Sequence, residues 1–280
     1  MAEALPFRLA GVMGWPVAHS RSPALHGYWL QRYGINGAYV PLAVRPERLE
    51  AALRGLPALG FAGCNITLPH KERAMQLVDR LEPIARRIGA INCIIVDAEG
   101  RLTGTNNDGY GYIESLKEAW PDWRASAGAA VVLGAGGGAR AVVASLIDEG
   151  APEIRLINRT GARAEGLARE YGSPVTAIPW ESRHDALDGA ALLVNTTSQG
   201  MVGQPPLELA LERLPKSAGV SDIVYIPLET PLLAAARARG NATVNGLGML
   251  LNQARPAFKA WFGVLPEVTA ELRQRVEATI

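Results

Sequence analysis

The chain has few of the features that mark extracellular proteins. Only two of its 280 residues are cysteines, and Cys64 and Cys93 lie in separate apolar segments. We therefore expect no disulfide framework, and the composition fits a reducing compartment. The opening Met-Ala-Glu-Ala-Leu-Pro has no basic stretch followed by a long apolar run, so we also expect no signal peptide and a cytoplasmic location.

Long apolar runs and a charge excess of one sign are lacking too. No apolar run reaches the ~18 residues that a membrane span needs, so we expect no membrane partner. The 28 Lys and Arg residues against 27 Asp and Glu residues leave a net charge of +1, which gives no reason to expect nucleic acid. The four histidines are scattered, so we expect no metal site. The length and the 48% apolar content indicate a globular protein of one large or two medium domains.

Glycine is plentiful, and it is concentrated after an apolar run in the middle of the chain. Residues 131–140 read Val-Val-Leu-Gly-Ala-Gly-Gly-Gly-Ala-Arg, and an apolar helical pattern follows. A strand, a tight turn and a helix in this order are what a dinucleotide pyrophosphate requires. We expect Gly134 to allow the turn, Gly136 to let the backbone approach the phosphates, and Gly137 or Gly138 to let the helix begin close by. The amides at the helix N-terminus would then bind the anion.

The next predicted strand indicates which dinucleotide binds. In NAD-binding proteins this strand usually ends in an acidic residue that holds the ribose 2′-hydroxyl. Here it ends in Asn158, Arg159 and Thr160, with Arg163 one helical step further. A carboxylate would repel a 2′-phosphate, whereas a guanidinium binds it with paired hydrogen bonds. The pattern predicts NADP rather than NAD; the alternative is a glycine-rich loop followed by two solvated arginines.

Alternating strand and helix patterns predict an α/β protein with a mostly parallel sheet. The strands are expected at 8–13, 38–44, 60–68, 91–96, 102–105, 131–133, 154–157, 192–195 and 220–224. The helices are expected at 23–33, 46–56, 71–81, 83–88, 109–118, 141–147 and 230–239, and from 249 to the end with a break near 263–266.

Two serines follow the first predicted strand. Ser20 and Ser22 stand two residues apart, and in an extended loop their hydroxyls would point the same way. They could bind a carboxylate or vicinal hydroxyls. The alternative is structural: Ser22 caps a helix whose first residue is Pro23, and Ser20 lies in a turn.

Polar residues also stand near the ends of later strands. Asn65 and Thr67 share one face of a strand, and Lys71 follows at the turn into a helix. A lone lysine is usually a solvated surface residue, but with Asp108 it would form a pair suited to proton transfer in carbonyl reduction. Asp108 alone fits a turn or a helix cap. Asn92 lies in an apolar strand and must find hydrogen bonds, from the fold or from a ligand.

Together these segments resemble the shikimate dehydrogenase family over nearly the full length of the chain. The matching blocks are Ser20 to Ser22, Asn65 to Lys71, Ala90 to Asn92, Asn106 to Gly109, Gly134 to Arg140, Asn158 to Arg163, Asn195 to Gly200 and Gly246 to Ala254. The resemblance implies NADP-dependent, reversible reduction of 3-dehydroshikimate to shikimate in aromatic amino-acid biosynthesis. It implies an N-terminal α/β substrate domain (1–108 and 245–280), on which the C-terminal helices pack, and a Rossmann-type NADP-binding domain (109–244).

The resemblance also assigns roles to residues. Lys71 and Asp108 look like the catalytic pair. The implied substrate residues are Ser20, Ser22, Asn65, Thr67, Asn92, Asp108, Tyr225 and Gln253. The implied cofactor residues are Gly134, Ala135, Gly136, Gly137, Gly138, Asn158, Arg159, Thr160, Arg163, Ile223 and Gly246.

Some positions depart from the family's usual forms. His70 stands where Phe or Tyr is common, Cys93 where Thr is common, and Asn107 where Thr is common, but none removes a group assigned above. Two other functions stay open: an NAD-dependent quinate/shikimate dehydrogenase, and a non-catalytic ligand sensor on the same fold. The expected assembly is a monomer or a homodimer.

Overall fold

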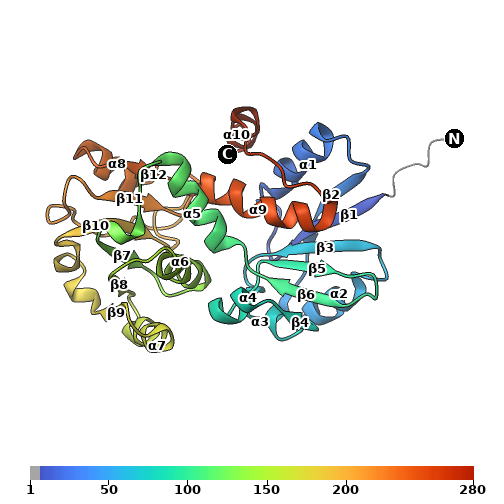
Figure 1. Cartoon of the computed structure of the whole chain (residues 1–280), viewed down its shortest axis with the longest axis horizontal. Coiled ribbons are helices and arrows are strands. Elements are labelled where there is room, and N and C mark those ends of the chain that lie inside the picture. Colours follow the sequence, from blue (N-terminus) through green and yellow to red (C-terminus); the bar gives the residue numbers. More distant parts are fainter. Residues whose placement is uncertain (1–6) are drawn as a thin grey trace. The chain divides into compact units, whose positions relative to one another are not determined.

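The computed structural model describes residues 7–280, which form a mixed α/β fold (Figure 1). The chain divides into two compact units. One holds the residues up to Asn107 together with Gln253–Thr279, and the other holds Asp108–Asn252 with Ile280. Each unit is built around its own six-stranded sheet.

The first unit has a mixed sheet. Its strands are β1 (Arg8–Gly14), β2 (Gly37–Ala43), β3 (Phe61–Ile66), β4 (Arg80–Leu81), β5 (Cys93–Val96) and β6 (Leu102–Thr105), in the order β2-β1-β3-β5-β6-β4. Its helices are α1 (Ser22–Arg32), α2 (Leu49–Gly55), α3 (Lys71–Met75), α4 (Pro83–Ile88) and α10 (Ala270–Glu277), with a short 3-10 turn at Pro46–Arg48. Helix α9 (Leu247–Phe262) begins in the second unit and continues into this one at Gln253.

The sheet is mostly parallel, as predicted: of the described strands β5 runs antiparallel to its neighbours β3 and β6, and the other three strand pairings are parallel. Two local expectations for this unit are wrong. The helix predicted at 71–81 ends at Met75, because Arg80–Leu81 pairs with β6 as an edge strand. Ser22 is not the cap of α1 but its first residue, and no side chain caps this helix.

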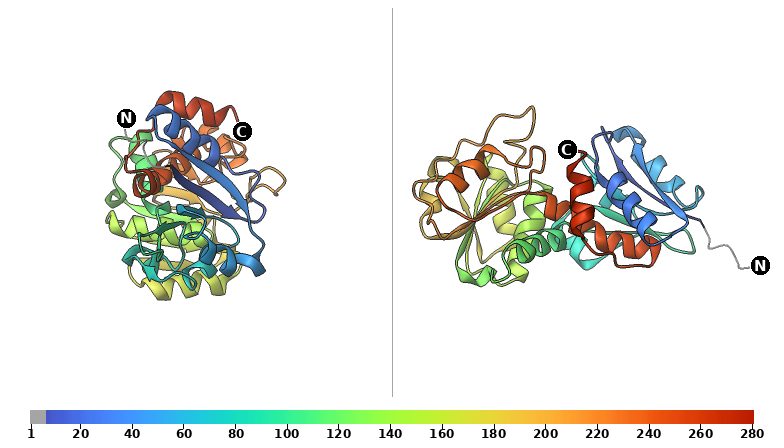
Figure 2. Two further views of the ribbon diagram at one scale, coloured as in Figure 1. Left: turned by 90° about the vertical axis from the view of Figure 1, so that its right-hand side faces the viewer. Right: turned by 90° about the horizontal axis from the view of Figure 1, so that it is seen from above.

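The C-terminal helices pack on the first unit, as predicted. The indole nitrogen of Trp261 in α9 donates to the carbonyl oxygen of Ile94 at 2.9 Å. A Cβ atom at Gly63 would collide with both groups, so only glycine lets the indole approach β3 this closely. Helix α10 lies beside α1 (Figure 1, Figure 2), where the hydroxyl groups of Tyr28 and Thr269 are 3.1 Å apart.

The second unit has a wholly parallel sheet. Its strands are β7 (Ala129–Leu133), β8 (Ile154–Ile157), β9 (Val175–Ile178), β10 (Ala190–Asn195), β11 (Gly219–Asp222) and β12 (Thr243–Val244), in the order β12-β11-β10-β7-β8-β9. Its helices are α5 (Asp108–Ala119), α6 (Gly137–Asp148), α7 (Gly161–Tyr171) and α8 (Pro231–Ala238). Short 3-10 turns lie at Ala125–Ala127, Trp180–Ser182 and Asp185–Leu187.

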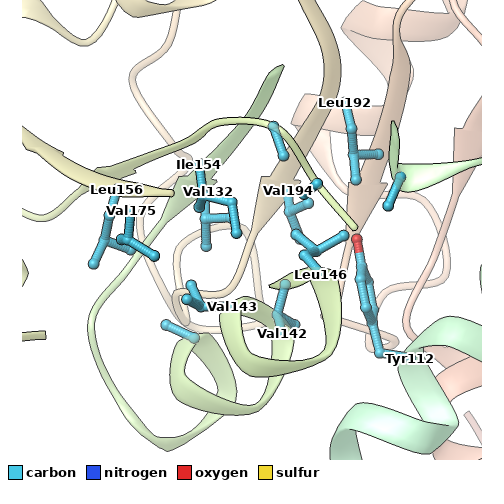
Figure 3. Packing of buried hydrophobic residues seen from close by; sticks show 14 of the residues in the cluster. Tyr112, Val132, Val142, Val143, Leu146, Ile154, Leu156, Val175, Leu192 and Val194 are labelled. Carbon is cyan, nitrogen blue, oxygen red and sulfur yellow. The ribbon is translucent and has the colours of Figure 1, made fainter. Parts of the chain in front are cut away.

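Alternate residues of the central strands fill two cores. Val132 and Val194 pack with residues of α5, α6 and α7, among them Leu146 (Figure 3). Val131 and Leu193 join the core that includes residues of α8. Strands buried on both faces with helices on each side form the doubly wound, Rossmann-type architecture that the sequence predicts. Among residues 7–280, no helix has the length and apolar composition needed to cross a membrane.

A buried histidine gives the first unit a predictable response to acid. The His26 ring is fully buried and stacks on Tyr39, with ring centroids 4.0 Å apart and planes 7° apart. Burial lowers the pKa of His26 from 6.5 to about 3. Between these two values the unfolded chain binds the additional proton, so stability rises with pH across this window and is lost as the pH falls through it.

We therefore expect His26→Phe, which keeps an aromatic ring and removes the proton site, to weaken the pH dependence of stability. The free energy of unfolding, measured with urea between pH 4 and pH 7, should change less with pH than in the parent, by up to roughly 1.4 kcal/mol per pH unit. His19→Phe, which alters an exposed histidine, is the control. An unchanged slope in His26→Phe would contradict the assignment.

Candidate active site

Asn65 is held by the fold of the first unit. Its neighbours in β3, Cys64 and Ile66, pack into the core beside α2, so Asn65 faces the other side of the sheet. There the Tyr39 hydroxyl donates to Asn65 Oδ1 at 2.7 Å, and Asn65 Nδ2 donates to the backbone oxygen of Asn92 at 3.0 Å. Both ends of the amide have partners within the protein, which fixes its orientation.

Asn92 connects three segments of the same unit. Its Nδ2 donates to Gln253 Oε1 in α9 at 3.2 Å, and its Oδ1 accepts from the backbone amide of Asn107 at 2.9 Å. The neighbouring Asn106 donates to the carbonyl of Ala90 at 2.9 Å. The hydrogen bonds that a polar residue in this apolar segment requires therefore come at least partly from the fold. They bring Asn65, Asn92 and Gln253 into one buried network.

Tyr39 belongs to this network through its hydrogen bond to Asn65, and the sequence did not single it out. Ser20 lies in a turn, and its Oγ accepts from the backbone amide of Ser22 at 3.3 Å. Burial raises the pKa of Tyr39 well above its ordinary value, and the nearby Ser22 side chain opposes that rise. The hydrogen bond that the Tyr39 hydroxyl donates goes to Asn65. A tyrosine is a common core residue of strands, so nothing in the sequence around Tyr39 indicated a functional role.

Thr67, His70 and Lys71 follow β3. The backbone amide of Thr67 donates to Met13 at 2.9 Å, and its side chain is half-buried. His70 is buried, with Nε2 2.7 Å from the carbonyl oxygen of Val44. Lys71 is half-buried at the first position of α3. Asp108 is buried at the first position of α5 and belongs to the second unit, so the catalytic pairing of Lys71 with Asp108 stays a prediction.

The glycine-rich turn has the predicted strand, turn and helix. Strand β7 ends at Leu133, and the amide of Gly134 donates to the carbonyl of Ile157 at 2.8 Å. Gly134 has a φ of +112°, and a Cβ there would lie 2.5 Å from Thr196 Oγ1. A Cβ at Gly136 would meet nothing within 4 Å. Helix α6 begins at Gly137 without a side-chain cap, so its first amides suit an anion such as a pyrophosphate.

Three of the predicted cofactor residues lie against one another in the second unit. A Cβ on Gly138 would stand 2.8 Å from Ile223 Cδ1, and one on Gly246 would collide with the carbonyl of Ile223. The amide of Gly246 donates to the carbonyl of Val224 at 3.0 Å. Tyr225 follows in the same loop and is half-buried. The two glycines therefore leave room for the Ile223 segment beside the start of α6.

The strand end expected to select NADP is polar and accessible. Asn158 follows β8, and its Nδ2 donates to the carbonyl of Thr160 at 2.9 Å. Thr160 precedes α7, whose first turn holds no acidic residue. Arg159, Thr160 and Arg163 are exposed. Two guanidinium groups beside a helix N-terminus suit a phosphate. Within residues 7–280, no group of three or more His, Cys, Asp and Glu side chains is arranged to hold a metal ion.

Comparisons with known proteins agree with this arrangement. The family model for the shikimate dehydrogenase substrate binding domain matches residues 12–94, and the model for shikimate/quinate 5-dehydrogenase matches residues 117–216. A shikimate dehydrogenase (NADP(+)) of Rhodospirillum rubrum is 61% identical over 273 residues, which are 96% of each chain. The chain belongs to the shikimate dehydrogenase family.

Solved structures of related proteins have a fold similar to that of this chain. Shikimate 5-dehydrogenase of Thermus thermophilus in complex with NADP(H) and shikimate has a TM-score of 0.88 and 38% identity, and the match covers 98% of this chain and 100% of that one. Quinate dehydrogenase of Corynebacterium glutamicum in complex with NAD has a TM-score of 0.90 and 30% identity, over 98% and 100% of the two chains. The family fold is therefore shared by proteins solved with different cofactors.

The glycine turn of this family member allows a matched pair of substitutions. Gly134→Ala places a side chain at a positive φ and against Thr196, which should lower the free energy of unfolding by roughly 1–3 kcal/mol. Gly136 has a negative φ, and a Cβ there would meet open space, so the free energy of unfolding of Gly136→Ala should stay within about 0.5 kcal/mol of the parent value. Urea unfolding without nucleotide measures both. Equal losses in the two variants would contradict the predicted role of Gly134.

Proposed function

We propose that this chain is an NADP-dependent shikimate dehydrogenase that interconverts 3-dehydroshikimate and shikimate. The observation that carries the proposal is the pair of exposed arginines, Arg159 and Arg163, where β8 leads into α7, behind a glycine turn fit for a pyrophosphate. The relative from Rhodospirillum rubrum carries NADP(+) in its name, and the Thermus thermophilus structure holds NADP(H) and shikimate.

Each domain has its own task in this proposal. Residues 1–108 and 245–280 form the substrate domain, and residues 109–244 form the NADP-binding domain; Tyr225 and Gly246 are the exceptions, assigned to the substrate and to the cofactor. The groups that would hold NADP are Gly134, Ala135, Gly136, Gly137, Gly138, Asn158, Arg159, Thr160, Arg163, Ile223 and Gly246. Bound NADPH supplies the hydride for the ketone carbon of the substrate, and the protein supplies orientation and charge.

Lys71 and Asp108 are the proposed proton-transfer pair. As negative charge develops on the carbonyl oxygen, the Lys71 ammonium stabilises it and donates a proton; in the reverse direction the neutral amine accepts one. Asp108 orients the ammonium and accepts a hydrogen bond from a neighbouring substrate hydroxyl. The Asp108 side chain is buried.

The other proposed substrate residues differ in the part of the substrate that they would bind. Ser20 and Ser22 would bind the carboxylate, and Thr67, Asn92, Tyr225 and Gln253 would bind the ring hydroxyls and the carboxylate. Asn65 acts in support, because its amide already bonds with Tyr39 and Asn92. Hydrogen bonds that hold these side chains before substrate arrives reduce the entropy lost on binding.

A second candidate is an NAD-dependent quinate/shikimate dehydrogenase. The quinate dehydrogenase of Corynebacterium glutamicum, solved with NAD, favours it through its TM-score of 0.90. Arg159 and Arg163 count against it, because neither offers the acceptor that a ribose 2′-hydroxyl requires. We also propose a cytoplasmic enzyme, in which Cys64 and Cys93 stay reduced, that works as a monomer or a homodimer.

Lys71→Ala tests the proton-transfer role. Turnover of shikimate with NADP should fall about 10² to 10⁴-fold, because the group that donates and accepts the proton is lost, while NADPH binding should change little. Reduction of NADP followed at 340 nm and a fluorescence titration of NADPH measure the two quantities. Lys117→Ala removes an exposed lysine paired with Glu149 and serves as control. Near-normal turnover in Lys71→Ala would refute this role.

Arg159→Ala and Arg163→Ala test cofactor choice. Each should lower kcat/KM for NADP about 10 to 100-fold through lost charge-assisted hydrogen bonds, and leave kcat/KM for NAD nearly unchanged. Arg169→Ala, an exposed position on the same helix paired with Glu165, is the matched control. Dominant NAD use by the parent, or equal losses with both cofactors, would favour the second candidate. The same assay with quinate in place of shikimate separates the two substrates.

A further inference from the structure

A fully buried carboxylate lies at the end of β11, outside the residues assigned so far. Asp222 is the last residue of this strand and has no exposed surface. Its Oδ1 accepts from Asn195 Nδ2 and from the backbone amide of Val224, both at 3.0 Å. Its Oδ2 accepts from the Thr230 hydroxyl at 2.7 Å. One carboxylate therefore receives three hydrogen bonds from three separate positions.

Each donor belongs to a different part of the second unit. Asn195 ends β10, and its Oδ1 accepts from the amide of Thr197 at 3.0 Å and from its hydroxyl at 2.8 Å, so it shapes the loop after that strand. Thr230 caps α8 by accepting from the amide of Leu233 at 3.4 Å. Asp222 thus ties the end of β10, the loop after β11 and the start of α8 together.

The loop between Asp222 and Thr230 carries two residues of the proposed site. Ile223 donates its backbone amide to the carbonyl of Asn195 at 3.0 Å and packs against Gly138. Tyr225 follows two residues later. The carboxylate bonds directly to the amide of Val224, the residue between them. The position of both side chains relative to α6 therefore depends on how Asp222 is held.

We infer that Asp222 is a positioning residue that sets the conformation of residues 223–230 and so places Ile223 for the cofactor and Tyr225 for the substrate. This inference rests on the proposed function for its catalytic consequence, but the structural role of Asp222 does not depend on it.

The chemistry of the carboxylate supports this role. An ionised carboxylate only accepts hydrogen bonds, whereas an asparagine would turn an NH₂ group toward one of the three donors. Burial raises the pKa of Asp222, and hydrogen bonds from Val224, Thr230 and Asn195 oppose that rise. A buried carboxylate is a poor source of stability compared with an apolar side chain. What it contributes is a unique geometry for three backbone segments.

Asp222→Asn, which replaces one acceptor oxygen with an NH₂ group, and Thr230→Val, which removes one donor, test the inference separately. Hydrogen exchange of the peptide spanning 223–230 should become faster in both variants, about tenfold at the Val224 amide in Asp222→Asn. The dissociation constant of NADP and the KM of shikimate should rise about tenfold, with kcat changed less. Thr230→Ser keeps the hydroxyl and should restore parent values.

Asn241→Ala is the matched control. Asn241 is buried in the same unit at the opposite end of the sheet, just before β12, and donates to the carbonyls of Pro215, Lys216 and Ala218. Its loss should lower the unfolding midpoint without affecting KM or exchange at 223–230. Unchanged exchange at 223–230 in Thr230→Val, or equal changes in KM in Asn241→Ala, would overturn the inference. If the parent fails to oxidise shikimate, the proposed function fails, and the exchange experiment still decides the role of Asp222.

Discussion

The structure depends on one requirement: polar side chains buried at the ends of the central strands must find hydrogen bonds within the chain. In the first unit Asn65 in β3 bonds with Asn92, which lies just before β5, and Asn92 bonds with Gln253 in α9. In the second unit Asn195 at the end of β10 donates a hydrogen bond to Asp222 at the end of β11. Because each group has several partners, the loops that follow these strands have little freedom, and those loops carry the proposed site.

Much of the second unit could be predicted, because the information there is local. The turn after β7 needs a positive φ at Gly134, and the apolar spacing after it is that of a helix, so neighbouring residues suffice. In the first unit local signals misled. Ser22 followed by proline is typical of a helix cap, yet the serine is the first residue of the helix. The pattern at 71–81 is helical, yet Arg80–Leu81 pairs with β6, which no local signal reveals.

The residues of the candidate site also divide into those that the local sequence indicated and those that it did not. Asn65, Asn92 and Lys71 were predicted because a polar residue near the end of an apolar strand requires an explanation. Tyr39 and Asp222 were missed because their partners are distant: Tyr39 bonds with a residue 26 positions away, and Asp222 with one 27 positions away. A tyrosine in a strand and an aspartate before a turn both have ordinary structural explanations. Only the folded structure shows that Tyr39 bonds across to β3 and that Asp222 joins the end of β10, the loop after β11 and the start of α8.

In the proposed function, the residues for substrate and those for cofactor recognition differ in how the fold holds them. Asn65, Asn92 and Gln253 are buried and bonded to one another, so the shape they present is set when the protein folds. Arg159 and Arg163 are exposed, so holding these long side chains on an anion costs conformational entropy at the moment of binding. On this proposal, a change of cofactor requires new side chains at the surface and leaves the core intact. A change of substrate requires a buried network to be rebuilt, because removing one partner leaves another polar group unsatisfied.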